Sequence, residues 1–195
     1  MAMREEFDKY LLLKKLSEDP LGETFRAGRM GSGSLDQVVL LRVLNGPRLD
    51  GQALARELPG RAAIQQALKS PNIGNGVEVG VFRGVPFLAY DYISGRNLAA
   101  LVQQAERQTS PIAVDHALLI AERIALALAV AHETRANGER LSHGFLVPHL
   151  VMISNEGETR VLGFEVGPLL AQQARGGTFE PEVSSYLAPE VIAGQ

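Results

Sequence analysis

Four histidines are the side chains of this sequence best suited to acid–base or metal chemistry near neutral pH. His116 and His132 fall on one predicted helix, too far apart along its axis to share a metal ion. His143 precedes a Gly-Phe pair and His149 follows Pro148, and neither has a second ligand at metal-binding spacing. The chain has no cysteine, which excludes thiolate ligands and thiol nucleophiles. We therefore expect no metal site, and we interpret His149 as a solvated loop residue.

The overall composition is that of a folded protein. Of the 195 residues, 46% are apolar and 21% are charged, which is too much apolar surface for a disordered chain. The net charge is -3 and the basic residues are scattered, which argues against a nucleic-acid-binding surface. No apolar run reaches the roughly eighteen residues that a membrane span needs, and the acidic N-terminus is unlike a signal peptide. We expect a cytoplasmic protein, or the cytoplasmic part of a larger one.

The first half of the chain reads as short strands with one helical interruption. A helix is predicted from Pro59 to Leu68, because Pro59 suits a first turn and Pro71 prevents continuation. Ser94-Gly95 reads as a hinge before the second half. The predicted strands, separated by turn residues, are Tyr10 to Leu16, Glu23 to Arg29, Val38 to Leu44, Val77 to Phe82 and Pro86 to Ile93.

The second half begins with two predicted helices, Leu98 to Arg107 and Val114 to Thr134. Two brief strands, Leu150 to Ile153 and Thr159 to Leu162, follow, and residues from Gly163 to Gln195 read as loops. The longer helix is apolar on nearly every side. Exposing its Leu and Ile side chains would forfeit about 1.5–3 kcal/mol each. We therefore expect self-association or a protein partner along this helix, which light scattering would detect as a mass above the monomer's.

Three motifs in the second half resemble those of the protein kinase family, in order and in spacing. His143 to Leu150 stands where kinases have His-Arg-Asp-Leu-Lys-Pro-x-Asn, and Gly163-Phe164-Glu165 stands where they have Asp-Phe-Gly. Ala188-Pro189-Glu190 matches their Ala-Pro-Glu triplet. Lys69 to Ile73 is similar to the element after the kinase C-helix, and Tyr90 to Ile93 to the hinge between the lobes.

The resemblance covers nearly the whole chain and is nearest to Ser/Thr kinases of bacterial type. It implies an α+β fold with a five-stranded N-lobe that carries one C-helix, over residues 1–93. A truncated, mainly helical C-lobe would follow over residues 94–195 and end just after Ala-Pro-Glu. In kinases the histidine at the place of His143 packs beneath the catalytic loop.

The resemblance also implies that the catalytic chemistry is lost. In an active kinase an Asp of the catalytic loop accepts the substrate's proton, while a nearby Asn and the Asp of Asp-Phe-Gly hold magnesium. Phe145, Leu150 and Gly163 stand at these three places and can do neither. Arg42 replaces the strand-three lysine, and its usual Glu partner on the C-helix aligns with Arg61, so we expect two cations that form no pair. This pattern is typical of a pseudokinase without catalytic residues.

The implied nucleotide site is degenerate in a similar way. Asp19 stands where backbone amides should approach phosphate, and its carboxylate would repel a phosphate group. Leu40 replaces a small alanine over the adenine. We expect no cofactor, with weak binding of ATP as the alternative, and no metal. The residues of this weak, vestigial pocket would be Gly22, Leu40, Arg42, Asp91, Ile93 and Met152.

These positions predict a catalytically inactive signalling module that acts as a protein-interaction or allosteric scaffold. Its expected surfaces are the helix Val114 to Thr134 and the activation-like segment Glu165 to Tyr186. One alternative is an atypical Ser/Thr kinase with Glu165 as a relocated metal ligand. Another is a sensor that binds ATP without metal through the backbone of Tyr90 to Ile93. A thermal shift with ATP would favour the alternatives, and magnesium dependence of that shift would favour the kinase.

Overall fold

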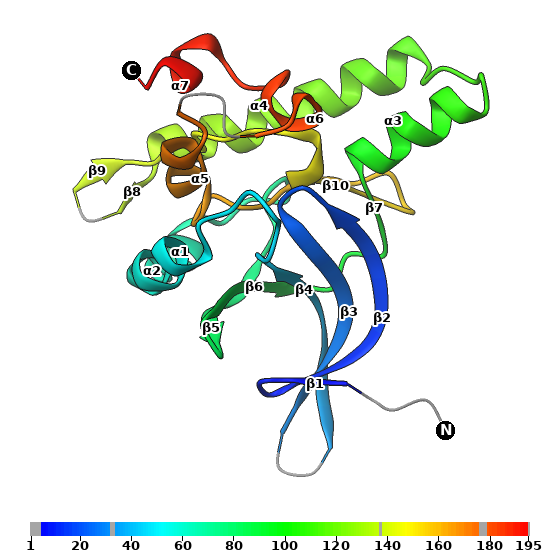
Figure 1. Cartoon of the computed structure of the whole chain (residues 1–195). Helices are drawn as coiled ribbons and strands as arrows, with labels where there is room; N and C mark the ends of the chain where they lie inside the picture. The colour runs from blue at the N-terminus through cyan, green and yellow to red at the C-terminus, as the bar shows by residue number, and fades with distance from the viewer. Residues whose placement is uncertain (1–4, 32–33, 137, 176–178, 195) are drawn as a thin grey trace.

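The first part of the chain builds a curved antiparallel sheet of six strands. The structure, a computed structural model, describes residues 5–31, 34–136, 138–175 and 179–194 (Figure 1). The strand order is β1-β2-β3-β4-β6-β5, so β4 lies inside the sheet and is buried over its second half. The strands are β1 (Glu6–Phe7), β2 (Tyr10–Asp19), β3 (Gly22–Met30), β4 (Leu35–Val43), β5 (Gly76–Phe82) and β6 (Val85–Asp91).

The helical segment between β4 and β5 begins earlier than predicted and is broken. It consists of α1 (Gly51–Glu57), the 3-10 turn η1 (Leu58–Arg61) and α2 (Ala63–Ala67). The side chain of Asp50 caps α1 by accepting a hydrogen bond from Ala53 N at 2.9 Å. Pro59 lacks a backbone N–H, and it falls inside the segment, at the 3-10 turn. The single predicted helix from Pro59 to Leu68 was therefore wrong in its start and in its continuity.

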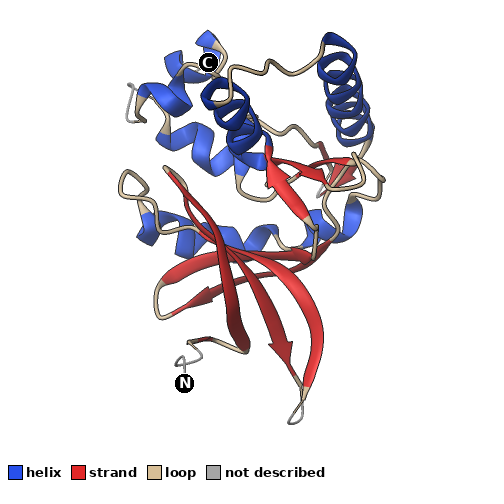
Figure 2. Ribbon diagram, turned by 90° about the vertical axis from the view of Figure 1, so that its right-hand side faces the viewer, coloured by secondary structure: helices blue, strands red, loops and turns tan. Residues whose placement is uncertain are grey.

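The second part of the chain is mainly helical and carries a small sheet of three strands in the order β11-β10-β7. Figure 2 shows most of its helices gathered at the end of the molecule opposite the six-stranded sheet. A two-stranded ribbon of β8 and β9 follows α4. The elements are β7 (Gly95–Asn97), α3 (Leu98–Arg107), α4 (Val114–Glu133), β8 (Arg135–Ala136), β9 (Glu139–Arg140), η2 (Pro148–Leu150), β10 (Val151–Ser154) and β11 (Thr159–Val161).

The stretch after Gly163 was predicted to be loops, and this was wrong. It contains three short helices, α5 (Gly167–Gln173), α6 (Pro181–Ser184) and α7 (Pro189–Ala193). Each has a proline in its first turn, where the missing N–H costs no hydrogen bond. Their lengths of four to seven residues are too short for a helical period to stand out in the sequence.

One buried cluster joins the two parts of the molecule. It combines Leu40, Leu88 and Tyr90 from the six-stranded sheet with Phe145 and Leu150 from the second part. Phe145 and Leu150 are both 0% exposed. The two parts are thus held together by apolar packing directly beside the region where the kinase resemblance places catalytic residues.

Helix α4 leaves much of its apolar surface uncovered. Only Ala127 and Ala131 are buried along its 20 residues. Val114 is 72% exposed, and Leu118 is 63% exposed. Within the described residues, no helix has the length and apolar character that a membrane crossing requires.

A candidate ligand cleft between the two sheets

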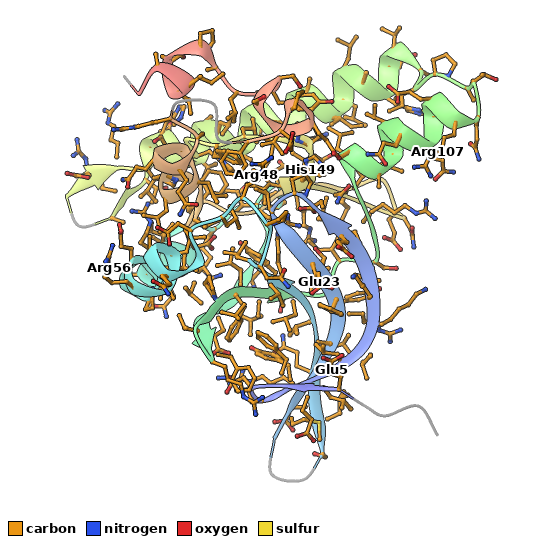
Figure 3. All side chains as sticks on the ribbon, in the orientation of Figure 1. Glu5, Glu23, Arg48, Arg56, Arg107 and His149 are labelled. Carbon is orange, nitrogen blue, oxygen red and sulfur yellow. The ribbon has the colours of Figure 1, made fainter. Side chains whose placement is uncertain are left out.

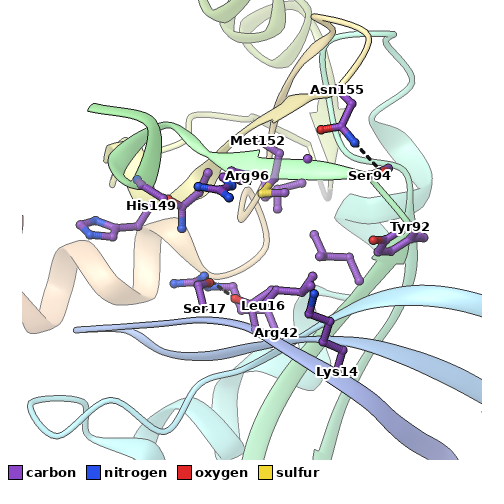
Figure 4. A pocket seen from close by; sticks show the side chains of 16 residues that line it. Lys14, Leu16, Ser17, Arg42, Tyr92, Ser94, Arg96, His149, Met152 and Asn155 are labelled. Carbon is purple, nitrogen blue, oxygen red and sulfur yellow. Dashed lines mark hydrogen bonds between the residues drawn. The ribbon is translucent and has the colours of Figure 1, made fainter. Parts of the chain in front are cut away.

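A cavity of about 470 Å³ lies between the six-stranded sheet and the small sheet (Figure 4). Leu16 and Leu40 contribute apolar wall from the six-stranded sheet, while Met152 and Leu162 contribute it from the second part. Polar groups come from Ser17, Thr24, Tyr92, Ser94, Asn97 and Asn155, and cationic or basic groups from Lys14, Arg42, Arg96 and His149. The volume suits a small organic ligand.

The loop that precedes η2 packs into the core. Phe145 contacts the ring of Phe179 with a centroid separation of 5.2 Å. His143 Nε2 lies 2.8 Å from the carbonyl oxygen of Leu162, and its ring packs edge-on against Phe164. Burial lowers the pKa of His143 to about 4, so its ring is neutral at physiological pH. This is the packing role that the resemblance implies for His143.

Gly163 stands where the resemblance expects a metal-binding Asp, in a backbone conformation that suits glycine. Its φ is +87°, and a Cβ atom there would lie 3.2 Å from Leu150 Cδ1. An Asp at this position would therefore need a strained backbone. The N–H of Gly163 donates to the hydroxyl of Tyr90 at 3.0 Å.

Glu165 lies inside the protein and does not line the cavity. Its Oε2 accepts a hydrogen bond from the Tyr90 hydroxyl at 2.9 Å, and the residue is 3% exposed. Burial raises the pKa of Glu165, while hydrogen bonds from Tyr90 and Gln65 and the charge of Arg61 oppose this rise. The alternative in which Glu165 is a relocated metal ligand finds no support in this position, because its carboxyl lies outside the cavity lining. Among the described residues, no group of three or more His, Asp or Glu side chains is placed to hold a metal ion.

Arg42 forms a buried ion pair with Asp19. Its Nη2 lies 2.7 Å from Asp19 Oδ1 and 3.0 Å from Oδ2, and its Nη1 donates to Thr24 Oγ1 at 3.0 Å. The side chains of Arg42 and Asp19 are only 2% and 4% exposed. The carboxylate thus occupies the guanidinium of Arg42, a group that would otherwise suit a phosphate. Asp19 was expected only to repel phosphate, and its pairing with Arg42 was missed.

The turn between β2 and β3 is closed by its own side chains. The N–H of Leu21 donates to Asp19 Oδ1 at 2.9 Å, and the Leu21 side chain is 0% exposed. Gly22 has a φ of +133°, and a Cβ atom there would lie 2.1 Å from Val43 O. The backbone amide of Leu21 is therefore already used within the turn and is not free to bind a phosphate.

Arg61 and Arg42 have separate partners. Arg61 ends η1, and its Nε donates to the carbonyl oxygen of Glu165 at 2.5 Å. Burial lowers the pKa of Arg61, and Glu165 and Glu139 oppose this effect. The two cations were expected to form no pair with each other, and the sequence did not reveal that Arg42 pairs with Asp19 or that Arg61 donates to Glu165.

Of the six residues expected in the vestigial pocket, Leu40, Arg42 and Met152 line the cavity. Gly22, Asp91 and Ile93 lie outside its lining. Asp91 instead accepts hydrogen bonds from Gln37 Nε2 at 2.8 Å and from Asn75. The sequence reasoning missed Arg96 and His149 as lining residues, although two basic residue types beside the hinge and the η2 turn are a signal that could have been used.

His149 is buried, so its interpretation as a solvated loop residue was wrong. It is 3% exposed, and Figure 3 places it inside the molecule rather than at the periphery, where Arg56 and Arg107 lie. Its Nε2 lies 3.4 Å from Glu182 Oε1, beyond the usual hydrogen-bond range. Its Nδ1 has no hydrogen-bond partner among the described residues. The preceding Pro148 opens η2, and both His149 and Leu150 of this turn are buried.

The buried carboxyl of Glu165 makes stability depend on pH. Because its pKa is raised in the native state, that state binds more protons than the unfolded state between the ordinary value of 4.5 and the raised value. Stability is therefore expected to fall as pH rises through this interval and to level off above it. The variant Glu165→Gln should lack this fall, so its stability relative to wild type should increase with pH. Urea unfolding between about pH 4 and about pH 8 tests this; a pH-independent difference would contradict it.

The curved antiparallel sheet, the helical segment after its third long strand and the helical second part together define the protein kinase fold. A double mutant of the PknI kinase domain of Mycobacterium tuberculosis matches with a TM-score of 0.73 and 23% identity, over 100% of this chain and 70% of that chain. Another structure of the same kinase domain matches with a TM-score of 0.70 and 22% identity, over 100% of this chain and 67% of that chain. The predicted α+β, kinase-like fold class is confirmed, and β1 extends the expected sheet by one short strand.

Curated relatives are also named as kinases. Tyrosine-protein kinase MasK of Myxococcus xanthus is 22% identical over 200 residues, which cover 100% of this chain and 31% of that protein. Probable serine/threonine-protein kinase PknB of Lactococcus lactis is 26% identical over 189 residues, which cover 96% of this chain and 28% of that protein. The chain thus spans about a third of the length of these relatives. No family model matches it.

Proposed function

We propose that this chain is a catalytically inactive kinase-like module, a pseudokinase, that acts in signalling as a protein-interaction or allosteric scaffold. The observation that carries this proposal is the complete burial of Phe145 and Leu150, each 0% exposed. These are the places where the kinase resemblance expects the base and one magnesium ligand. An apolar core has no group to accept a proton there. The relatives are named as kinases and are 22% and 26% identical to this chain. Phe145 and Leu150, however, are apolar and differ in kind from the catalytic pattern.

The recognition role is supported by the uncovered face of α4. Val114, Leu118, Leu119 and Leu126 are between 42% and 72% exposed on this one helix. An apolar patch of this kind typically marks an interface. We propose that α4 and the exposed side chains of the segment from Glu165 to Tyr186 form contact surfaces of the module. Glu165 itself is buried, and residues 176–178 of this segment lie outside the described residues. Residues 1–93 and 94–195 would act as its two lobes. A change in how the lobes pack at their junction would alter both contact surfaces.

The second candidate function is a sensor that binds an adenine nucleotide without a metal. The observation that favours it is the composition of the cleft. Apolar walls are retained at Leu40, Met152 and Leu162, while cations line the same cavity. Leu40 narrows the site relative to the alanine expected there, which favours a small ligand over a large one.

One preparation of the protein tests the proposed function through two measurements. Incubation with γ-labelled ATP and magnesium or manganese should transfer no labelled phosphate to the protein itself or to casein. An active kinase assayed alongside should label both itself and casein. Light scattering should give a mass above that of a monomer, because self-association would bury the exposed apolar face of α4.

The matched control for the transfer assay is Glu165→Gln. If the wild type transfers phosphate and this variant does not, the atypical-kinase alternative replaces the proposal. Transfer that survives in Glu165→Gln would also overturn inactivity and would exclude Glu165 as the metal ligand. A monomeric mass with a cooperative melt would remove self-association through α4.

A further inference from the structure

The uncovered face of α4 is acidic as well as apolar. Asp115, Glu122 and Glu133 are separated by about two and about three turns of the helix, so they lie along one side of it. Leu118 and Leu126 fall on the same side, and all five residues are exposed. The side chain of Glu122, in the middle of this row, is 61% exposed. A surface that covers this face must therefore combine apolar side chains with positive charge.

Two copies of the α4 face would not cover each other well. In an antiparallel pair of α4 helices, Asp115 of each copy would lie near Glu133 of the other, and the two Glu122 carboxylates would meet near the middle. In a parallel pair, each acid would lie near its own counterpart. Arg123 Nη2 is 3.9 Å from Glu122 Oε2, so it offsets only one of the three acids. Like charges that face each other therefore oppose symmetric pairing through α4.

Two unpaired cations lie side by side on the six-stranded sheet. Lys14 of β2 and Arg26 of β3 are directly opposite each other in the strand register, and both are exposed. Like charges at opposed positions destabilise a sheet unless something else neutralises them. Lys14 Nζ has no hydrogen bond or ion pair within the described part of the chain, and the Arg26 guanidinium lies 5.4 Å from the centre of the Tyr92 ring. This pair of cations thus lacks a carboxylate partner among the described residues.

Exposed leucines adjoin these cations. Leu13 is 41% exposed and Leu35 is 45% exposed. Both side chains lie over Gly28, where an added Cβ atom would meet them. Gly28 is two positions from Arg26 along β3 and therefore on the same face of the sheet. We call Leu13, Leu35, Lys14 and Arg26 the hairpin patch, and its combination of apolar surface and positive charge complements the α4 face.

We propose that α4 of one copy docks on the hairpin patch of a second copy. Glu122, in the middle of the acidic row, would lie between Lys14 and Arg26 and supply the carboxylate that both lack. Leu118 and Leu126 lie about one turn to either side of Glu122, so either orientation of the helix places a leucine over the apolar part of the patch. This inference rests on the proposed function, in which α4 is a contact surface, and it identifies what covers that surface.

The proposed contact joins different surfaces of the two copies. Figure 1 places α4 and the β3–β4 hairpin at opposite ends of the molecule, so one copy cannot make this contact with itself. Head-to-tail contacts of this kind close into a ring or continue as a chain. The mass of the assembly should therefore increase with protein concentration. Because the paired charges lie at the surface, added salt should weaken the assembly.

Light scattering of the whole chain at increasing protein concentration tests this inference. The double variant Lys14→Glu with Arg26→Glu should weaken association by at least about tenfold relative to the wild type. The matched control is Arg56→Glu with Lys69→Glu, which reverses one arginine and one lysine at exposed positions on the helical segment and just after it. Figure 3 places Arg56 at the periphery, and this control should associate as the wild type does. Circular dichroism checks that each variant is folded.

Exchanging the charges between the two surfaces provides a second test. Glu122→Lys alone should weaken association as much as the double variant Lys14→Glu with Arg26→Glu. The triple variant that combines these three substitutions should recover association, because its α4 face is less acidic and its hairpin patch has become acidic. A contact through α4 that does not involve the hairpin patch would show no such recovery.

Three results would overturn the inference: a monomeric wild type at every concentration, equal association of the double variant and its control, or a triple variant that does not recover. If Leu118→Glu abolishes association while the double variant behaves as its control does, α4 stays a contact surface and only the hairpin patch is removed. A monomeric wild type also removes self-association through α4. The transfer assay decides catalytic inactivity separately, so failure of this inference is distinct from failure of that part of the proposed function.

Discussion

The variant Asp19→Ala is expected to lose about 3–5 kcal/mol of unfolding free energy, because it leaves the buried guanidinium of Arg42 without its counter-ion. Arg42 is 2% exposed and Asp19 is 4% exposed, so the pair is largely shielded from water in the native protein. The same carboxylate also accepts from Leu21 N, which would lose its partner. Urea unfolding at neutral pH measures the loss, with the melting temperature as a second readout.

The matched control is an ion pair of the same type at the surface. Arg48 and Glu180 lie 55% and 51% exposed, and Glu180→Ala should cost less than about 1 kcal/mol. Replacing both buried partners, as Asp19→Leu with Arg42→Met, should recover most of the loss, since no isolated charge remains. If Asp19→Ala loses no more unfolding free energy than Glu180→Ala, the guanidinium of Arg42 does not depend on Asp19 as a buried counter-ion.

The variant Phe145→Asp, which restores the side chain that active kinases have at this place, is expected to unfold the protein rather than to create catalysis. Removing a buried phenylalanine costs about 3–5 kcal/mol, and an unpaired carboxylate in an apolar core adds to this cost. A domain of ordinary stability has only about 5–15 kcal/mol in total. Circular dichroism and urea unfolding report the fold, and the labelled-ATP assay reports transfer.

Phe145→Met is the control for this substitution. It keeps an apolar side chain of similar size in contact with Phe179, so it should cost less than about 1.5 kcal/mol. A folded Phe145→Asp variant with wild-type stability would mean that position 145 opens to solvent. Transfer by that variant would mean that the rest of a catalytic site is in place, against the proposed function.

The local patterns of the sequence were sufficient for the class of fold. Short apolar runs separated by turn residues predicted the long strands, and the spacing of three motifs in the second half pointed to the kinase fold. Alternation and turn chemistry act over a few residues, so they can be read without tertiary structure. The apolar nature of Phe145 and Leu150 is likewise visible in the sequence alone. The short helices after Gly163 were missed because four to seven residues carry too little periodicity.

The sequence by itself therefore determined the positions of the long strands along the chain, the long apolar helix and the apolar residue types at the places of kinase chemistry. Only the tertiary structure decided which charged and polar groups meet. Asp19 at the end of β2 reaches Arg42 on β4, Glu165 reaches Tyr90 over 75 positions, and His149 is buried in the η2 turn. Such pairs depend on strand register and on how the two parts of the molecule pack together. These decide which polar groups lie close enough to form a hydrogen bond once they are buried.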